Sequence, residues 1–597
     1  MSHKRPGFEE EKLGGFKALV QLRSTLLYVR GLTGLLALCG IGSLATSLLR
    51  ILLPLLMARG IDGYVLNQDL TYVEREEGLL RLAWAFLGLL VLNLALDYYT
   101  TVGLSHVGQR AIQAIRRAVW ERFHQLPIDY FDRNPVGRLV TRVANDTNAL
   151  LELFTSVLAT GVGDVCLLAG ILAVMLALNP QLTLILLILV PPMAAVTLWF
   201  KNASQVVHRE IRVLTARLNA FLQENVQGVA VVKSFTAHAR MKERFAVINQ
   251  DYFRAEMAMV HLFALFRPAY AVVQIVATAV LLWFGGLQVL QRQLSIGELV
   301  AFLFYLRMLF SPLQQLAEKF NLFQGAVVAS ERIFRILETP PEPGYGGSPP
   351  EQPFRGRVEF RDVEFAYDPE KPVLRGVTFA VEPGQKVALV GPTGSGKTTV
   401  AALLLRFYAL EERGSGEILV DGRPIQEWPV DELRRHIGMV QQNLFLFSTD
   451  LRRNIVLYED IPEERLEQAL EVSRARLVVE RMPEGLDRML GERGADLSQG
   501  ERQLLSFARA LAFSPEFLVL DEATASVDSK TEQAIQDALR ELLEARTALV
   551  IAHRLSTVQE ADRIVVLNRG KVVEQGTHRE LLAKDGLYAH LYRTQTL

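Results

Sequence analysis

The chain has 597 residues, half of them apolar, with a formal net charge of −1 and a mean hydropathy of +0.19. This length exceeds that of one compact domain, and the balanced charge provides no global field that would attract nucleic acid. The two cysteines, Cys39 and Cys166, both stand in apolar runs, which excludes a disulfide framework and a cysteine-based metal site and favours packing roles.

The first 30 residues are predicted to form a polar tail and a helix that lies in the membrane interface. Residues 1–15 are polar and charged and lack the apolar core of a secretory signal. Residues 16–29 (FKALVQLRSTLLYV) mix apolar and basic positions at helical spacing, directly before an apolar stretch. This position favours an interfacial helix, and a soluble amphipathic helix is the alternative.

Six apolar stretches follow, within a predicted transmembrane domain of residues 31–337. They cover residues 31–57, 79–96, 157–178, 182–200, 268–290 and 294–310. Several approach the roughly 20 residues that a helix needs to cross a bilayer. Ionisable residues within or beside these stretches either face a substrate cavity or pair between helices. They are Arg50, Asp97, Asp164, Glu298 and Arg307.

The connections between the stretches predict the orientation of the chain. The first is acidic, whereas the second and fourth are rich in Arg and Lys, which marks the cytoplasmic side. We therefore expect a multi-pass protein of the inner (cytoplasmic) membrane, with its C-terminal half in the cytoplasm. The second and fourth connections are long and helix-patterned, with turns expected near residues 131–141 and 217–228, where they can touch a soluble domain.

Residues 338–353 (ETPPEPGYGGSPPEQP) are dense in Pro and Gly and are predicted to be a linker. In residues 354–597, apolar strand-like runs alternate with helical ones, which is an α/β pattern. The C-terminal part is therefore predicted to be a separate soluble domain.

Residues 391–398 (GPTGSGKT) match the phosphate-binding loop pattern GxxxxGK[ST], between a strand-like run and a helical run. The backbone N–H groups of such a loop converge on phosphate oxygens, Lys397 supplies positive charge, and the hydroxyl of Thr398 is placed to ligate Mg²⁺. The predicted ATP-binding residues of this segment are Gly391, Thr393, Gly394, Ser395, Gly396, Lys397, Thr398 and Thr399.

Two further segments complete the predicted nucleotide site. Residues 517–522 (FLVLDE) form a buried strand that ends in two carboxylates, where Asp521 can hold the Mg²⁺ shell and Glu522 can polarise an attacking water. Residues 497–503 (LSQGERQ) open a helix, and Ser498 with Gly500 offer a hydroxyl and free N–H groups to an anion.

Together these motifs resemble those of ATP-binding cassette (ABC) proteins, and the resemblance covers nearly the whole chain. Six spans followed by one cassette resemble an exporter half-transporter. The resemblance implies a polytopic α-helical membrane domain plus an α/β P-loop nucleotide-binding domain, with ATP and Mg²⁺ as cofactors. It also implies that Lys397, Glu522 and His553 are catalytic, that Tyr367 stacks on adenine, and that Gln442 senses Mg²⁺. Ser498 and Gly500 then contact the ATP of an opposite cassette, across an interface that includes Asp528.

One departure from the family pattern concerns the signature, which is LSQGE here instead of LSGGQ. Gln499 adds bulk, and Glu501 adds a negative charge that repels a triphosphate unless it is paired or turned away. The chain's own hydrolytic residues match the family. The combination of intact hydrolytic residues with an altered signature resembles bacterial heterodimeric multidrug exporters of the TmrAB type. In these, the second half-transporter has a weakened catalytic carboxylate and an LSGGQ signature. A homodimer that tolerates LSQGE is the alternative.

Three functions compete. The first is ATP-driven export or flipping of amphiphilic drugs, lipids or peptides, in contact with membrane lipids. The second is a membrane-anchored regulator that binds ATP without transport, against which the presence of Glu522 and His553 argues. The third is an importer, which the fusion of membrane part and cassette in one chain disfavours.

Overall fold

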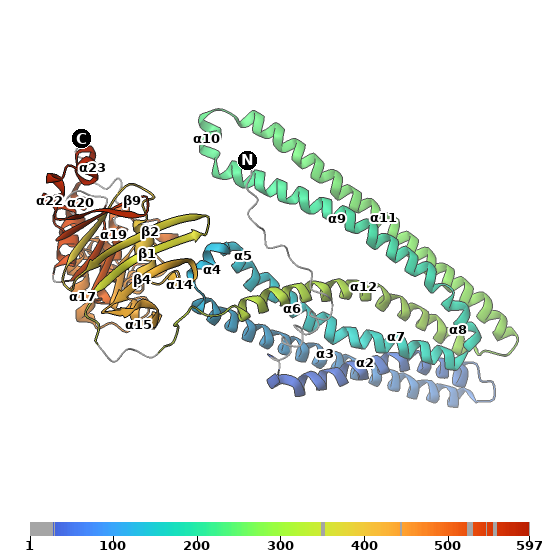
Figure 1. Ribbon diagram of the computed structural model, residues 1–597. Coiled ribbons are helices and arrows are strands. Elements are labelled where there is room, and N and C mark those ends of the chain that lie inside the picture. Colours follow the sequence, from blue (N-terminus) through green and yellow to red (C-terminus); the bar gives the residue numbers. More distant parts are fainter. Residues whose placement is uncertain are drawn as a thin grey trace. The chain divides into compact units, whose positions relative to one another are not determined.

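The computed structural model describes residues 28, 30–347, 353–441, 444–521, 529–544, 546–552 and 558–595. They form two compact units, described separately below (Figure 1). The first comprises Met1–Trp120 and Leu139–Glu338, and the second comprises Glu121–Arg138 and Thr339–Leu597, in both cases as far as these are described. The predicted interfacial helix lies outside the described residues, apart from Tyr28.

The described residues of the first unit form helices joined by short turns, and none of them forms a strand. Its helices, including those that continue into residues 121–138, are α2 (Thr33–Gly60), α3 (Tyr72–Gln125), α5 (Val136–Thr141), α6 (Thr147–Glu152), α7 (Ala159–Leu178), α8 (Pro180–Leu187), α9 (Val190–Gln227), α10 (Val229–Ser234), α11 (His238–Leu290) and α12 (Ile296–Glu338). Since α3 has 54 residues, it is about 80 Å long at 1.5 Å per residue. The longest helices therefore extend well beyond a bilayer.

Five helical stretches among the described residues are long and apolar enough to cross a membrane. They are Thr33–Val65, Tyr72–Gln125, Val136–Leu178, Pro180–Gln227 and His238–Leu290, which correspond to the first five predicted stretches. The sixth predicted stretch, residues 294–310, lies mostly in α12. The fourth is divided between α8 and α9, because Pro191 and Pro192 fit the first turn of a helix but not its interior.

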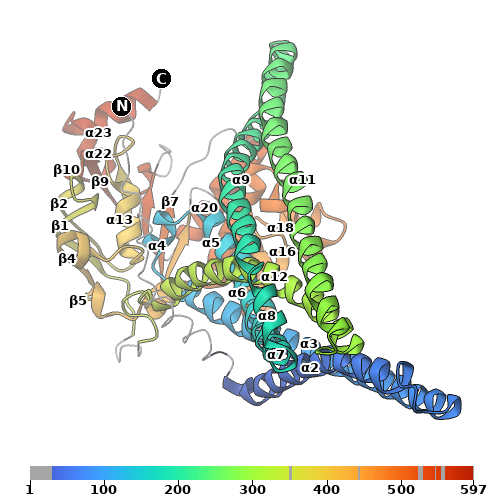
Figure 2. The ribbon, with the colours of Figure 1, turned by 90° about the vertical axis from the view of Figure 1, so that its right-hand side faces the viewer.

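Helices α2, α7 and α12 contribute to one apolar core in the first unit. Ile51, Ile171 and Tyr305 are almost fully buried there, and the Tyr305 hydroxyl donates a hydrogen bond of 2.7 Å to the Ile51 carbonyl. Gly163 allows close approach of α7 to α2, since a Cβ atom at this position would lie 2.5 Å from Ser43 Oγ. Helices α9 and α11 lie side by side and are joined at one end through α10 (Figures 1 and 2).

The second unit contains two sheets. The first is antiparallel, in the order β2 (Lys371–Val381), β1 (Val358–Asp368), β4 (Gly414–Val420) and β5 (Arg423–Pro424). The second has the order β10 (Lys571–Gly576), β9 (Arg563–Asn568), β3 (Lys386–Val390), β8 (Thr547–Ile551), β7 (Phe517–Asp521) and β6 (Ile437–Val440). It is parallel except for β10. Strands β7 and β8 are buried along their whole length, as expected for a sheet covered on both faces.

Helices pack around these sheets. They are α4 (Ile128–Arg133), α13 (Lys397–Leu404), α14 (Leu410–Arg413), α15 (Val430–His436), α16 (Leu451–Val456), α17 (Glu463–Val472), α18 (Arg476–Glu480), α19 (Gln499–Ala512), α20 (Ser529–Leu543), α22 (His578–Ala583) and α23 (Leu587–Gln595). The predicted fold class, a polytopic helical domain with a P-loop nucleotide-binding domain, is confirmed.

The segment that follows α12 is fixed to the second unit. Glu342 is buried, and its carboxylate accepts hydrogen bonds of 2.9 and 2.6 Å from the Arg434 guanidinium. Arg406 donates to the Pro343 carbonyl at 3.1 Å, and the Glu342 amide donates to the Gln125 carbonyl at 2.7 Å. The described part of the predicted linker is therefore held by specific contacts and does not act as a free spacer.

Candidate ATP site and its surroundings

The phosphate loop connects β3, a central strand of the parallel sheet, to α13. Gly396 has a φ of +105° at the start of α13, a conformation that favours glycine. At Gly391, a Cβ atom would lie 2.0 Å from the carbonyl oxygen of Leu567, so any side chain would collide with β9. These two glycines let the loop turn tightly at the carboxyl end of β3, where its backbone N–H groups precede the first turn of α13.

The side chains of the loop fit an oxyanion. Ser395 Oγ is buried and has no hydrogen-bond partner within the described part of the chain, so it has an unused donor. Lys397 Nζ donates to the carbonyls of Gly391 and Pro392 at 2.7 and 3.0 Å, and burial lowers the pKa of its amino group, which Asp521 partly opposes. A phosphate group satisfies both needs, because it accepts from Ser395 and supplies negative charge to Lys397.

An oxygen-lined position for a hard cation lies beside the loop. The Thr398 hydroxyl donates to Asp521 Oδ2 at 3.3 Å, and Asp521 is the last residue of β7 and is buried. Hydroxyl and carboxylate oxygens are typical Mg²⁺ ligands, and Mg²⁺ in nucleotide sites usually takes only one or two from the protein. The strand order brings these two residues together, although they are far apart in the sequence.

Tyr367 lies at the edge of this site. Its hydroxyl hydrogen-bonds to Thr399 Oγ1 at 3.2 Å, and its ring stands edge-on to that of Tyr408, with the ring centroids 4.8 Å apart. The side chain is 39% exposed, so part of its ring is accessible for stacking. The structure therefore brings Tyr367, Lys397, Thr398, Thr399 and Asp521 into one site.

The signature segment begins helix α19. Ser498 is the N-cap, and its hydroxyl accepts a hydrogen bond of 3.2 Å from the Glu501 amide. Ser498 and Gln499 are exposed, whereas Gly500 is buried. Among the described residues, no hydrogen bond or ion pair joins Ser498, Gln499 or Gly500 to residues 391–399. Within the described part of the chain, Ser498 and Gln499 are thus exposed and not tied to the phosphate loop of their own chain, and the composite site stays a prediction.

Four of the predicted site residues cannot be placed. Gln442, Glu522, Asp528 and His553 lie outside the described residues. Their roles remain predictions, which for Gln442, Asp528 and His553 rest on the family resemblance and for Glu522 also on its place directly after Asp521 in the sequence.

Helix α4, from the second cytoplasmic connection, belongs to the second unit. Arg413 of α14 donates to Asp129 Oδ2 at 2.6 Å, and the Tyr408 hydroxyl donates to Asp132. Burial and the neighbouring Asp132 raise the pKa of Tyr408 well above its usual value. The turn was predicted at residues 131–141, a range that includes Asp132 but not Asp129. Sequence reasoning therefore missed one of these two contact residues.

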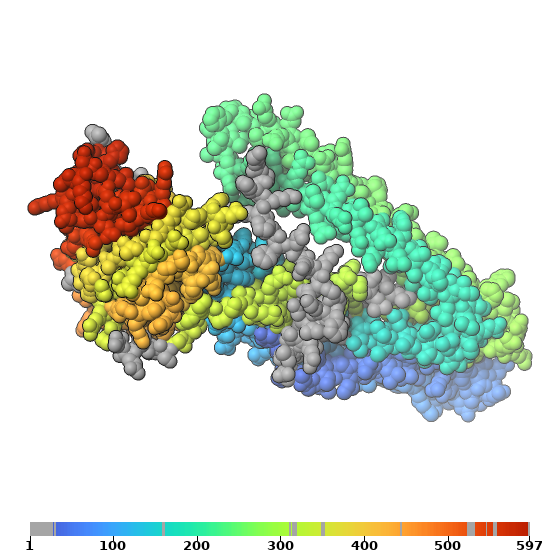
Figure 3. All heavy atoms as spheres, viewed as in Figure 1, coloured from blue at the N-terminus to red at the C-terminus, as the bar shows by residue number. Residues whose placement is uncertain are grey.

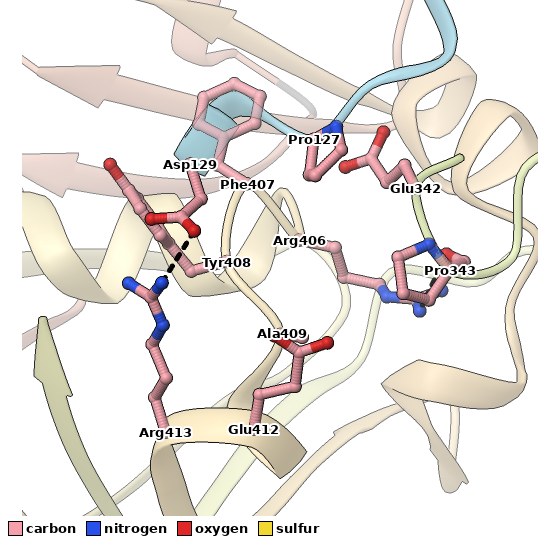
Figure 4. Close-up of a pocket in the computed structure, with 10 residues that line it drawn as sticks. All are labelled: Pro127, Asp129, Glu342, Pro343, Arg406, Phe407, Tyr408, Ala409, Glu412 and Arg413. Atoms are coloured by element: carbon pink, nitrogen blue, oxygen red, sulfur yellow. Dashed lines mark hydrogen bonds and ion pairs between the residues drawn. The ribbon is translucent and has the colours of Figure 1, made fainter. Parts of the chain in front are cut away.

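A cavity of about 50 Å³ lies beside these contacts, lined by Asp129, Arg406, Tyr408 and Arg413 among others. Figure 4 shows the Asp129–Arg413 pair at one side of this cavity, with Glu342 and Pro343 at the other. Since Tyr408 contacts Tyr367 through its ring and Asp132 through its hydroxyl, only this one residue stands between α4 and the candidate nucleotide site.

Most ionisable residues of the membrane helices have structural partners. Asp164 of α7 pairs with Lys319 of α12, and Arg50 pairs with Asp97 at 3.2 Å. Glu298 caps its own helix, since its carboxylate accepts from the Ser295 amide at 2.9 Å. Arg307 is exposed within the described part of the unit. Of the two predicted roles, helix pairing is the one that the structure supports for Asp164, Arg50 and Asp97.

Replacing Asp164 with alanine is expected to destabilise the protein by about 3–5 kcal/mol, because it leaves the Lys319 charge buried without a partner. The side chains of Lys319 and Asp164 are only 11% and 17% exposed. Thermal unfolding in detergent measures the effect. The matched control, D164N/K319Q, removes both charges and is expected to recover most of the stability. Equal melting temperatures of D164A and the unmodified protein would contradict this role.

Comparison with known proteins identifies the chain. The model of the ABC transporter transmembrane region matches residues 36–313, and the ABC transporter model matches residues 374–525. The fatty acid ABC transporter ATP-binding/permease protein of Mycobacterium bovis is 40% identical over 81% of this chain and 76% of its own length. The ATP-dependent lipid A-core flippase of Nitrosococcus oceani is 34% identical over 88% of both chains.

A similar solved structure is that of a bacterial Atm1-family ABC exporter with ATP bound, with a TM-score of 0.75 and 28% identity. The match covers 95% of this chain and 98% of that one. The resemblance inferred from the motifs is thereby confirmed over both domains. The chain belongs to the ABC transporter family and is a multi-pass ABC exporter, whose cytoplasmic cassette binds ATP and couples its hydrolysis to transport.

Proposed function

We propose that this exporter moves amphiphilic molecules, such as lipids, drugs or peptides, out of the cytoplasm or between the leaflets of the inner (cytoplasmic) membrane. The observation that carries this proposal is the charge pairing inside the membrane unit. Because Asp164, Arg50 and Asp97 are engaged by neighbouring helices, recognition falls mainly to apolar side chains. The names of two relatives, a fatty acid transporter and a lipid A-core flippase, support the same substrate class.

The proposed catalytic arrangement uses Mg²⁺-bound ATP. Lys397, Ser395 and the glycines of the loop hold the phosphates, Tyr367 stacks on the base, and Thr398, Asp521 and Gln442 hold Mg²⁺, which neutralises charge on the phosphates. Glu522 orients and polarises the attacking water, and His553 contacts the terminal phosphate. The orphaned hydroxyl of Ser395 and the adjacent oxygens of Thr398 and Asp521 support this assignment.

The experiment uses purified transporter in lipid vesicles, with ATP hydrolysis measured against a panel of lipids, dyes and apolar peptides. We expect stimulation by some amphiphiles and ATP-dependent movement of the same compounds. ATP binding without stimulated hydrolysis or movement of any compound would favour the alternative of a non-transporting, ATP-gated regulator.

We further propose that the chain works with a second ABC half-transporter. A composite ATP site needs the phosphate loop of one chain and the α19 end of another. The end of the α9–α11 pair also carries exposed apolar side chains around α10, with Phe235 80% exposed and Val226 71% exposed. Figure 3 shows this pair in green, with its end at α10 open on the face in view. Such a surface suits contact with a partner.

The identity of this partner is proposed from Gln499, an exposed glutamine where the family signature has glycine. It favours a heterodimer, in which LSQGE faces a partner site with a weakened carboxylate. A homodimer is the second candidate, because the Ser498 amide and Arg481 engage the two oxygens of Glu501, so its charge is compensated and does not disable the signature.

Expression of this chain alone separates the two candidates. A heterodimeric half is expected to give monomers or dimers with little transport, and full activity is expected to return when the partner half-transporter is co-expressed. Native mass and ATPase activity are the measurements. A stable homodimer with two equally active sites and full transport would contradict the heterodimer proposal.

A further inference from the structure

The first turn of α19 contains a carboxylate whose two oxygens are both engaged. Glu501 Oε2 accepts a hydrogen bond of 2.9 Å from the Ser498 amide, which closes a capping box with the Ser498 hydroxyl. Glu501 Oε1 lies 3.6 Å from Nη1 of Arg481. The Glu501 side chain is 21% exposed, and it folds back over the first turn of α19 toward the Ser498 amide.

Arg481 lies outside every motif of the cassette. It follows α18 directly and comes 17 positions before Ser498 in the printed sequence. Its side chain is 66% exposed, so it contributes mainly its positive charge and makes few packing contacts. The pair therefore places one positive charge against the carboxylate that distinguishes LSQGE from LSGGQ.

The negative charge of Glu501 matters because the N-terminal end of α19 attracts anions. Free N–H groups and the helix dipole favour an anion there, and a nucleotide triphosphate brings several negative charges. A carboxylate in this first turn repels that anion unless a cation compensates it. Arg481 supplies this compensation in the structure.

A second capping box in the same chain shows that the arginine is not needed for the box itself. At α22, Glu580 accepts from the Thr577 amide at 2.9 Å, and the Thr577 hydroxyl accepts from the Glu580 amide. Within the described residues, no arginine pairs with this glutamate, and the charge of Lys584 acts on it without forming an ion pair. The contribution of Arg481 at α19 is thus electrostatic and is separable from helix capping.

We propose that Arg481 is a positioning residue of the composite ATP site, which holds and neutralises Glu501 so that the LSQGE signature accepts the triphosphate bound by the partner. This inference rests on the proposed function, in which the end of α19 meets that ATP.

The test replaces Arg481 with alanine in the full-length, assembled transporter. We expect the ATP concentration for half-maximal nucleotide occlusion to rise by about two- to fivefold, the range for an exposed ion pair. Occlusion is the primary readout because it also reports a site with slow hydrolysis, and kcat is expected to change little. Raising the salt concentration is expected to shrink the difference, because exposed charges are screened.

The double variant R481A/E501Q tests whether Arg481 acts by neutralising the Glu501 charge or by supporting the local structure. If Arg481 acts through the Glu501 charge, R481A has no effect in the E501Q background. R488A is the matched control, since Arg488 forms a similarly exposed pair with Glu484 at 3.4 Å, and it is expected to behave like the unmodified protein. An unchanged ATP dependence in R481A, or an equal loss in the E501Q background, would overturn the inference.

A further variant separates this inference from the proposed function. S498A removes the hydroxyl that the composite site offers to the phosphate. If S498A impairs nucleotide occlusion while R481A does not, the composite site stands and only the role of Arg481 fails. If S498A leaves occlusion and hydrolysis intact, the composite site itself is wrong, and the role of Arg481 fails with it.

Discussion

Replacing Glu522 with glutamine is expected to preserve ATP binding and to reduce hydrolysis at this chain's phosphate loop by about a hundredfold or more. The amide keeps the shape of the side chain but cannot act as a base, and general base catalysis contributes roughly 10²–10⁴-fold to rate. The residue directly follows Asp521 in the sequence, and Asp521 is the last residue of β7 and one of the proposed Mg²⁺ ligands. Phosphate release and nucleotide occupancy of the purified transporter are the measurements.

The control for this variant is E516Q, which changes another carboxylate next to β7. Glu516 pairs with His436 at 3.0 Å and is half-exposed, at the opposite end of the strand. It is expected to leave hydrolysis unchanged. Hydrolysis at the unmodified rate in E522Q would remove Glu522 from the catalytic role. Loss of ATP binding would show that the residue supports the loop instead.

Breaking the contacts of α4 is expected to uncouple ATP hydrolysis from transport. D129A removes the partner of Arg413, whose side chain is only 15% exposed. It leaves a nearly buried charge, at a cost of about 3–5 kcal/mol to the docked state. D132N weakens the acceptor of Tyr408. We expect basal hydrolysis to persist, while stimulation by substrate and transport per ATP fall by about tenfold or more, since 1.4 kcal/mol corresponds to a factor of ten.

Charge exchange tests whether the pair itself is responsible. D129R/R413D restores an ion pair with reversed polarity and is expected to recover part of the coupling. D585N is the control, because Asp585 forms an exposed pair with Arg593 far along the chain from α4, and it should have no effect. Full coupling in both D129A and D132N would show that these contacts only position the helix.

The phosphate loop illustrates what a local pattern can predict. Its function depends on consecutive residues, because the glycines, Lys397 and Thr398 lie within eight positions and their geometry follows from a strand, a tight turn and a helix. The same holds for the apolar stretches, which directly reflect the thickness of a bilayer. Family, fold class and ATP-coupled export were therefore predicted from the sequence and confirmed by comparison.

Contacts between distant residues were not predictable in this way. Asp164 and Lys319 were not recognised as a pair, because 155 positions separate them and only the packing of α7 against α12 brings them together. Asp129 and Arg413 are farther apart still, and no periodicity links a loop of the membrane half to a short helix of the cassette. Burial makes such pairs specific, because a charge removed from water requires a partner.

Glu501 illustrates which conclusions the amino-acid sequence allows and which require the tertiary structure. The sequence determined that a carboxylate stands in the signature and that its charge opposes a triphosphate unless it is paired or turned away. Only the tertiary structure decided between these outcomes, since the capping box directs one oxygen to Ser498 and the fold places Arg481 beside the other. A side chain's charge is fixed by its residue type, whereas the field around that charge depends on which distant residues the fold brings near it.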